Sequence, residues 1–241
     1  MPVGLLKGKI HIMCELLNSI ALLHLPGDCL ERPTVTVNCA ASIDGKISTA
    51  KRRRVALSDK SDLARVRELR KTHDAIAVGI GTVLADDPAL AAEVRNGQKP
   101  PARIVFDSSG RTPGGSKVLS GQGRTYIITT ESCSRKVPGA TMIRCGRKRV
   151  DMRKALNLLY SEGIKSVLVE GGGEVIFELA RLHLIDRLSI YVAPVLIGGR
   201  KAPTIADGGG FTDEKEFERF RLKAVNVLGE GLLMEYDRTV D

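Results

Sequence analysis

The sequence predicts an α/β fold with a mostly parallel central sheet, flanking helices and an antiparallel hairpin at its C-terminal end. Two observations predict this class. Between residues 33 and 180, short β-branched runs alternate with helical patterns, which is typical of parallel strands joined by helices. Beyond residue 186 the chain contains strand-like runs only, so these strands are expected to pair antiparallel at one edge of the sheet.

The strands are predicted from runs that are apolar or β-branched and are bounded by glycine, proline or aspartate. In the first part of the chain these runs cover residues 34–39, 75–78, 103–107, 125–130 and 166–169. In the last part they cover residues 187–195, 221–228 and 232–236. Gly229-Glu230-Gly231 separates the last two runs and favours a hairpin turn.

Helices are predicted where apolar residues recur every three or four positions. Leu63, Val66 and Leu69 place an apolar stripe on a helix from about residue 59 to 72. A second helix follows Val150-Asp151, and two more are expected to start at the glycines after residues 78 and 170.

Composition limits the class of protein and of partner. With 241 residues, 43% of them hydrophobic, the chain can bury the core of one large domain. Its formal charge of +9 indicates anionic partners, either a nucleic acid or small phosphorylated molecules. Only 4% of the residues are aromatic, which disfavours single-stranded nucleic acid. The five cysteines include no C-x-x-C pair, so we expect a cytoplasmic location, no disulfide framework and no structural metal.

Residues 1–31 differ in composition from the rest and are predicted to be an extension, followed by one domain over residues 32–241. Residues 10–25 are rich in leucine and isoleucine, but polar residues interrupt them. This run is shorter than the roughly 20 apolar residues that span a bilayer, so no membrane partner is expected. A docking helix and a signal peptide are the alternatives, and no convincing small-residue cleavage site supports the second.

The most informative motif follows the run at 166–169, where Glu170 precedes Gly171, Gly172, Gly173 and a helical pattern. Bare backbone N–H groups at such a helix start favour a phosphate, although a plain connection between strand and helix has the same pattern. A carboxylate at the carboxyl end of a strand lies where open α/β sheets bind their ligands. Glu170 therefore favours a ligand site.

Three more segments are candidates for a site. After the run at 75–78, Thr82 and Asp86 lie four residues apart and share one face of a short helix. They can bind a ribose or an amide, or serve as an N-cap and a C-terminal turn. Asp44-Gly45 is either an ordinary turn or an exposed carboxylate at a strand end. The basic run at 51–54 is either a solvated loop or a phosphate contact.

Taken in order, these motifs resemble those of the riboflavin-biosynthesis reductases, a family with a dihydrofolate-reductase-like fold. The resemblance extends from about residue 33 to 236 and rests on the segments 42–46, 78–88, 107–108, 170–173 and 193–199. The second and fourth segments are specific in combination. The chain lacks the H-x-E and P-C-x-x-C signatures of the zinc deaminase that bacterial relatives carry, so a reductase acting alone is expected.

The resemblance implies an oxidoreductase that uses NADPH, or NADH, to reduce the ribosylamino side chain of a phosphorylated pyrimidine. It implies that the cofactor-binding residues are Gly79, Gly81, Thr82, Val83, Leu84 and Asp86 in one loop and Gly171, Gly172, Gly173 and Glu174 in another. It places Asn38, Ser42, Arg70 and Ser108 against the substrate, with Asp44 and Glu170 as the catalytic carboxylates. Glu170 is expected to accept hydrogen bonds from the pyrimidine amino groups.

One position departs from the family pattern, because Glu93 stands where bacterial relatives have an arginine. Arg70 and the run at 51–54 are therefore the expected phosphate ligands. The resemblance also implies a homodimer, in which the apolar run at 188–196 is expected to offer its flank to a second copy.

Two alternatives remain. A reductase on the same fold that acts on the deaminated pyrimidine or on a pterin would keep the glycine loops. A nucleic-acid-binding protein would explain the charge but would leave the glycine turn and the Thr82/Asp86 pair without a purpose, so no nucleic-acid partner is expected.

Overall fold

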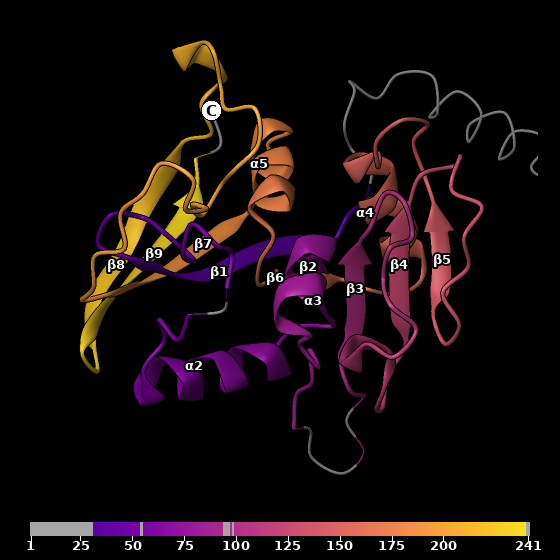
Figure 1. The fold of residues 1–241 in the computed structure, drawn as a ribbon, viewed down its shortest axis with the longest axis horizontal. Coiled ribbons are helices and arrows are strands. Elements are labelled where there is room, and N and C mark those ends of the chain that lie inside the picture. The colour runs from indigo at the N-terminus through magenta and orange to yellow at the C-terminus, as the bar shows by residue number, and fades with distance from the viewer. Residues whose placement is uncertain (1–30, 54, 94–96, 98, 240–241) are drawn as a thin grey trace, which may run out of the picture. The chain divides into compact units, whose positions relative to one another are not determined.

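A computed structural model describes residues 31–53, 55–93, 97 and 99–239. The predicted extension lies outside this range except for its last residue. In the described part, nine strands form one sheet: β1 (Thr34–Ser42), β2 (Ala75–Gly79), β3 (Ala102–Phe106), β4 (Thr125–Thr129), β5 (Thr141–Arg144), β6 (Ser166–Val169), β7 (Arg187–Ala193), β8 (Phe220–Leu228) and β9 (Gly231–Arg238). The helices are α2 (Lys60–Lys71), α3 (Ile80–Asp86), α4 (Met152–Ser161) and α5 (Gly173–Arg181) (Figure 1).

The strand order is β5-β4-β3-β2-β6-β1-β7-β9-β8. Neighbouring strands from β5 to β7 in this order are parallel, whereas β9 pairs antiparallel with both β7 and β8. The predicted α/β class with an antiparallel C-terminal hairpin is therefore confirmed. Because parallel strands end at the same edge of a sheet, the segments after β1, β2 and β6 come together there.

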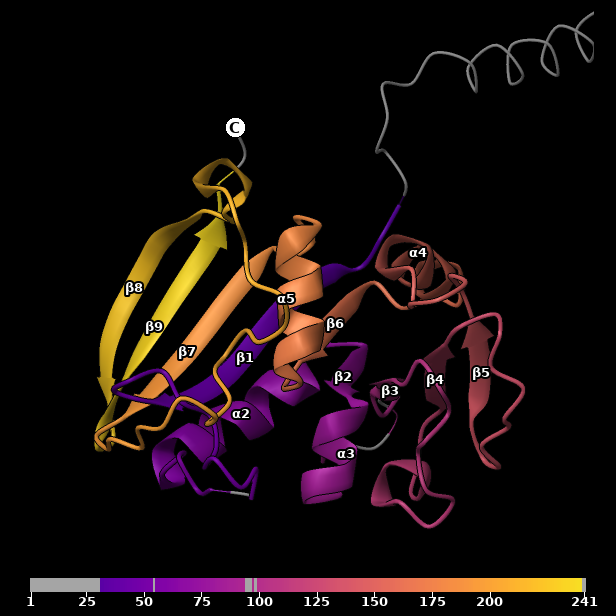
Figure 2. The same cartoon turned by 45° about the horizontal axis from the view of Figure 1, so that its top comes forward.

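Helices cover both faces of the sheet, α4 and α5 on one face and α2 and α3 on the other (Figure 2). Under α4 and α5, the largest core contains strand residues such as Val37 and Ile104 together with Leu179 of α5. Under α3, a second core contains Val78 of β2 and Val83 of the helix. The parallel strands are thus buried on both faces, which explains why their sequences are continuously apolar.

Two of the helices start where an aspartate caps them. The carboxylate of Asp59 accepts a hydrogen bond from the Asp62 N–H at 2.8 Å, and that of Asp151 accepts one from the Lys154 N–H at 3.0 Å. Each bond satisfies a backbone donor that has no partner within the helix. None of the helices in the described residues combines the length and the apolar character that crossing a bilayer requires.

Polar contacts, rather than the predicted apolar stripe, hold α2 on the sheet. Leu63 is 48% exposed, so the stripe was wrong at this position, while Asp62 is 1% exposed. Arg65 donates hydrogen bonds to Asp62, to Asn38 of β1 and to Ser189 of β7. The sheet presents polar side chains to the helix at this place, and therefore an ion pair fits there better than leucine does.

Three further details differ from the sequence prediction. β5 was not predicted, because it is four residues long and only Ile143 in it is buried. The run at 187–195 ends as a strand at Ala193, since Pro194 has no N–H to donate. β7 pairs with β1 on one side and with β9 on the other, so the flank predicted to meet a second copy is already occupied.

The glycine turns after β2 and β6 lie back to back. The Gly79 N–H donates a hydrogen bond to the Gly171 carbonyl at 3.1 Å, and Gly172 has a φ of +94°. A Cβ on Gly172 would lie 2.9 Å from the Cα and the N atom of Gly79. The backbones therefore touch without an intervening side chain, and this contact fixes the distance between the starts of α3 and α5.

We expect Gly172→Ala to lower the free energy of unfolding by about 1–3 kcal/mol, because it combines a left-handed φ with displacement of the Gly79 turn. Urea unfolding measures the change. Gly81→Ala is the matched control: a Cβ there meets nothing within 4 Å and the residue lies in α3. The control should stabilise the protein by about 0.5–1 kcal/mol. Equal stability of Gly172→Ala and the parent would show that the turns can separate freely.

Candidate active site

A cleft of about 230 Å³ opens at the carboxyl edge of the sheet. Its walls include Thr82 and Asp86 of α3 and Glu170 of the turn after β6, so the structure brings together three residues that the sequence assigned to one site. Beside the cleft, a Cβ on Gly171 would lie 3.1 Å from the Thr82 hydroxyl oxygen. The Gly171 backbone thus lies directly against the Thr82 hydroxyl, and backbone groups next to a hydroxyl are of the kind that phosphate and ribose groups bind.

The residues of α3 differ in what they can offer to a ligand. Asp86 and Asp87 both line the cleft, but Asp87 also ends the helix with a φ of +42° and accepts a hydrogen bond from the Lys117 N–H at 2.8 Å. Val83 is 2% exposed and belongs to the core, whereas Leu84 is 52% exposed. The Val83 side chain is therefore part of the core, and Leu84 is the one of the two that a ligand can reach.

Arg70 of α2 and Glu170 form a bidentate ion pair at the cleft. The Nε and Nη2 atoms of Arg70 donate to the two carboxylate oxygens at 2.7 and 2.6 Å, and the Glu170 side chain is 10% exposed. Burial alone would lower the pKa of Arg70, but the hydrogen bonds and the charge of Glu170 raise it. Arg70 thus stays charged, and each carboxylate oxygen of Glu170 has a further lone pair that can accept an N–H from a substrate.

Asn38 lies beside Glu170 on the face of the sheet that α2 covers. Val37 of β1 is in register with Val169, the last residue of β6, and from this pair we infer that the residues that follow, Asn38 and Glu170, lie close together. The Oδ1 atom of Asn38 accepts a hydrogen bond from Nη2 of Arg65 at 2.6 Å. Sequence reasoning missed Arg65. Its spacing of three residues from an aspartate predicts an ion pair on a helix, but not the burial of that pair.

Asp44 is held by hydrogen bonds at the end of β1. Its carboxylate accepts from the Ser42 hydroxyl at 2.7 Å and from the N–H groups of Ile197 and Gly198 at 3.0 and 2.8 Å. These bonds, the Ser42 hydroxyl first among them, lower the pKa of Asp44 to about 2. These contacts favour the ionised form of the Asp44 carboxylate. This carboxylate ties the end of β1 to the loop after β7.

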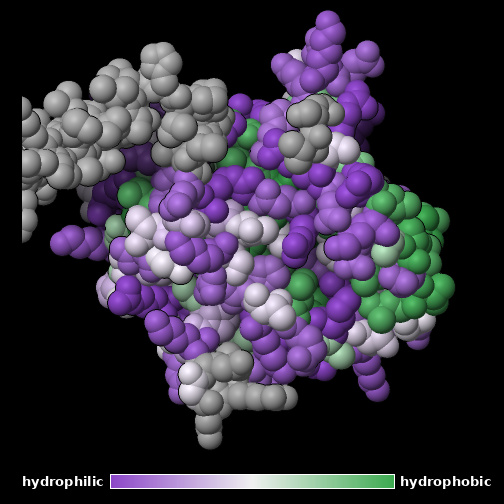
Figure 3. Space-filling model, turned by 180° about the vertical axis from the view of Figure 1, so that it is seen from behind, coloured by the Kyte–Doolittle hydropathy of each residue, from purple (hydrophilic) through white to green (hydrophobic). Residues whose placement is uncertain are grey.

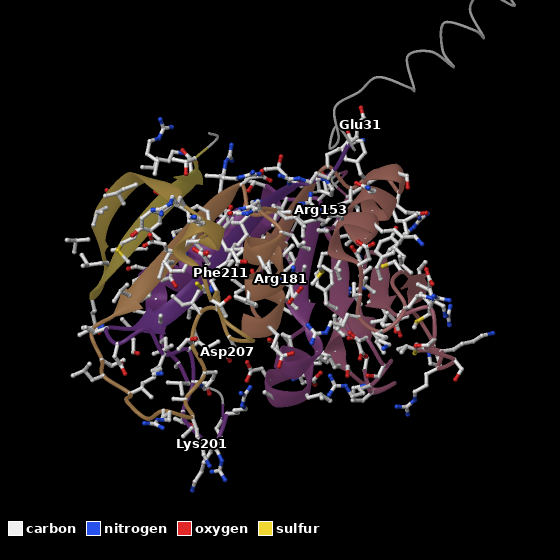
Figure 4. The ribbon with its side chains drawn as sticks, turned by 90° about the horizontal axis from the view of Figure 1, so that it is seen from above. Glu31, Arg153, Arg181, Lys201, Asp207 and Phe211 are labelled. Atoms are coloured by element: carbon white, nitrogen blue, oxygen red, sulfur yellow. The ribbon has the colours of Figure 1, made fainter. Side chains whose placement is uncertain are left out.

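Two basic loops run side by side at the same edge. The Ile47 N–H donates to the Pro203 carbonyl at 3.0 Å, and Nζ of Lys46 donates to the Ala202 carbonyl at 3.3 Å. Figure 4 shows Lys201 at the outer end of the loop after β7. Five exposed cations on these loops form no ion pair with any described residue: Lys51, Arg52, Arg53, Arg200 and Lys201. We call these five residues the basic loop pair.

The basic loop pair extends what the sequence suggested. The run at 51–54 was a candidate, and of it Arg54 lies outside the described residues. Arg200 and Lys201 were not predicted, although two basic residues directly after a Gly-Gly turn were a visible signal.

Most of the predicted site residues are not among those that line the cleft, and Ser108 and Glu174 are two of these. Ser108 follows β3, which β2 separates from β6, and its carbonyl accepts hydrogen bonds from the hydroxyls of Thr129 and Thr130 at 3.0 and 2.9 Å. Glu174 is exposed in the first turn of α5. The start of that helix contacts the loop that contains Asp207 (Figure 4). The Asp207 N–H donates a hydrogen bond to the carbonyl of Gly173 at 3.1 Å.

Comparison with known proteins identifies related chains over most of this length. The model of the RibD C-terminal domain family matches residues 33–234. The chain is 40% identical over 214 residues to the 2,5-diamino-6-ribosylamino-4(3H)-pyrimidinone 5′-phosphate reductase of Archaeoglobus fulgidus, which covers 83% of this chain and 95% of the relative. It is 38% identical over 213 residues to the reductase of the same name from Methanothermobacter thermautotrophicus, over 85% of this chain and 98% of the relative.

Solved structures share the fold. RibD of Acinetobacter baumannii matches with a TM-score of 0.74 at 23% identity, over 87% of this chain and 58% of that one, so this chain spans little more than half of that protein. The riboflavin biosynthesis reductase Rib7 of Saccharomyces cerevisiae matches with a TM-score of 0.69 at 24% identity, over 89% of this chain and 93% of that one. The expected α/β fold is thereby confirmed as one that proteins of riboflavin biosynthesis share. Since the family model covers most of its length and the archaeal reductases share about two fifths of its residues, the chain belongs to the RibD C-terminal domain family.

Proposed function

We propose that this chain is an NADPH-dependent oxidoreductase of riboflavin biosynthesis. It reduces the ribosylamino side chain of 2,5-diamino-6-ribosylamino-4(3H)-pyrimidinone 5′-phosphate to the ribitylamino form. The observation that carries the proposal is the Glu170 carboxylate, which Arg70 holds at the cleft next to the paired glycine turns. The names of the archaeal relatives support the choice of substrate.

The glycine turns fit a nicotinamide dinucleotide. Gly171 places bare backbone beside the Thr82 hydroxyl, and Asp86 adds a carboxylate one helical turn further along α3. Bound NADPH would supply a hydride to C1′ of the ring-opened, imine form of the substrate. The protein contributes orientation and a cleft that holds both reactants in contact. NADPH is the expected donor rather than NADH, because a formal charge of +9 favours the additional 2′-phosphate.

The substrate is assigned to the side of the cleft below α2. The free lone pairs of Glu170 accept N–H groups of the pyrimidine, and the neighbouring Asn38 amide contributes a further hydrogen bond. The 5′-phosphate is assigned to the basic loop pair, whose five cations have no acidic partner in the described part of the chain. Asp44 supports this assignment indirectly, since it orders the loop from which Arg200 and Lys201 extend.

A cytoplasmic location fits the thiols. Cys39, Cys133 and Cys145 are all free and buried, as expected in a reducing compartment. Burial raises the pKa of Cys39 to about 12 and that of Cys145 to about 11, so neither thiol is reactive at neutral pH.

A homodimer is proposed through the outer face of the hairpin rather than through β7. Val225 and Val227 of β8 are 51% and 80% exposed, and Leu232 of β9, which is in register with Val227, is 43% exposed. Leu222 adds a further 54% exposed side chain on β8. In Figure 3 an apolar area lies on the side of the molecule that contains β8 and β9. A second copy related by a two-fold axis would cover this face with an identical one.

The function is tested by following the absorbance of the reduced cofactor. The purified chain is mixed with NADPH or NADH and with either the diaminopyrimidinone phosphate or its deaminated form. We expect the fastest oxidation with NADPH and the diamino substrate.

Glu170→Gln should lower kcat/KM for the pyrimidine roughly tenfold or more, because a charge-assisted hydrogen bond contributes about 1.5–3 kcal/mol. It should leave the Kd of NADPH unchanged.

Asp86→Ala is the reciprocal variant in the same assay. It should raise the Kd of NADPH while the KM of the pyrimidine changes little, because Asp86 lies on the helix assigned to the cofactor. If both variants altered the same constant, the division of the cleft into two sides would be wrong. Oxidation of NADPH by a pterin alone would contradict the proposed substrate.

The double variant Arg200→Gln/Lys201→Gln tests the phosphate assignment. We expect the KM of the phosphorylated substrate to rise about tenfold, since two charge-assisted contacts to the phosphate are lost. The dephosphorylated substrate should react equally slowly with the variant and the parent. Arg147→Gln/Lys148→Gln removes the same charge from an exposed segment after β5 and should change neither constant. An unchanged KM in the first variant would place the phosphate elsewhere.

The dimer is tested by light scattering. Val225→Lys/Val227→Lys places two charges on the apolar face and should give a monomer. Asn226→Lys adds a charge at the position between them, which faces the opposite side of the strand, and should leave the dimer intact. A parent chain that scatters as a monomer would reject the proposal.

A further inference from the structure

The guanidinium of Arg65 is bound on three sides under α2. Its Nε atom donates to Asp62 at 2.9 Å, Nη1 donates to the Ser189 hydroxyl at 3.2 Å, and Nη2 donates to Oδ1 of Asn38 at 2.6 Å. Asp62 is itself 1% exposed and also accepts a hydrogen bond from the Ser58 hydroxyl. A planar guanidinium that is anchored by a buried carboxylate has little freedom to turn.

This anchoring decides which end of the Asn38 amide Arg65 holds and which end stays available for another partner. An amide has an acceptor oxygen and a donor NH₂ group, and a half turn of the side chain exchanges them. Arg65 binds both Asn38 and Ser189, so it lies on the side of β1 that faces β7. With Oδ1 bound to Arg65, the Nδ2 group is the end of the amide left on the other side, toward β6, where Val169 is the partner of Val37 and Glu170 is the next residue.

Arg65 also lies between Asn38 and a water-accessible cavity on the β7 side of β1. A second cavity, of about 160 Å³, lies between α2 and the strands β7 and β9, and Arg65 and Ser189 line it. A shorter side chain at position 65 would let water from this cavity reach Oδ1 of Asn38. The amide would then lose the partner that keeps it in one orientation.

We propose that Arg65 is a positioning residue for the reductase reaction: it fixes Asn38 with its N–H donor toward the substrate, beside the Glu170 acceptor. The proposal rests on the proposed function. It assigns to Arg65 no contact with substrate or cofactor, and it predicts that Arg65 acts through Asn38 alone. Donor and acceptor side by side match a pyrimidinone edge, on which a carbonyl oxygen neighbours an N–H group.

The test starts with the parent chain, the diaminopyrimidinone phosphate and NADPH. Without turnover in the parent, the proposed function fails, whatever the role of Arg65. With turnover, KM, kcat, the Kd of NADPH and Tm are measured for Arg65→Met/Asp62→Asn, which removes both charges so that no unpaired carboxylate stays buried. We expect the KM of the pyrimidine to rise about tenfold with an unchanged Kd of NADPH. Arg67→Met is the control on an exposed position of the same helix and should match the parent.

Arg65→Lys gives a second measurement that keeps the buried charges paired. Its ammonium can still donate to Oδ1 but cannot hold Ser189 and Asp62 at the same time, so we expect a rise in KM of about threefold. On an Asn38→Ala background the same substitution should change KM no further, because its target is gone.

Asn38→Asp separates orientation from packing, because it keeps the shape and the contact with Arg65 but presents an oxygen to the substrate. It should raise KM about tenfold or more without lowering Tm. The proposal would be overturned if Arg65→Lys raised KM by the same factor in the parent and on the Asn38→Ala background. It would also be overturned by a loss of NADPH affinity that parallels the rise in KM, since that would indicate a general distortion of the fold.

Discussion

The site depends on two arginines of α2 that replace an apolar contact between helix and sheet. Arg65 reaches the sheet at Asn38 of β1, and Arg70 reaches it at Glu170, the residue that follows β6. Polar groups removed from water are tolerated only where hydrogen bonds satisfy them, so a helix seated in this way has one well-defined position. The contacts that seat α2 also orient the side chains offered to a substrate. Folding and binding geometry are therefore set by the same atoms.

At the carboxyl edge of the sheet, the two proposed ligands are assigned to loops that follow different strands. The segments after β2 and β6 are glycine-rich and meet backbone to backbone, which suits the extended phosphates of a dinucleotide. The segments after β1 and β7 are basic and are tied together through Asp44. Glu170 belongs to the first pair and borders the second, because it follows β6, which lies between β2 and β1 in the sheet. Strand order alone thus puts one carboxylate within reach of both ligands.

The sequence predicted the strands of the parallel core closely, because their apolar runs are bounded by residues that end strands. It missed β5, in which one residue of four is buried, since so short and polar a segment has no recognisable periodicity. The cleft residues Thr82, Asp86 and Glu170 follow from motifs. The neighbourhood of Asn38 and Glu170 does not, because it requires the strand order β6-β1 and the register between these strands. Arg65 was missed for a related reason: a charged pair on a helix usually faces water.

The contact between Gly79 and Gly172 has a consequence for how sequences of this kind can diverge. In most cores a larger side chain on one residue can be balanced by a smaller one on its neighbour, so pairs of positions drift together. Here both partners are already glycine and the distance is set by backbone atoms, so no smaller residue exists to compensate. A substitution at either position therefore cannot be compensated by a substitution at the other. Any replacement has to be accommodated by moving α3 or α5, which would shift the walls of the cleft with it.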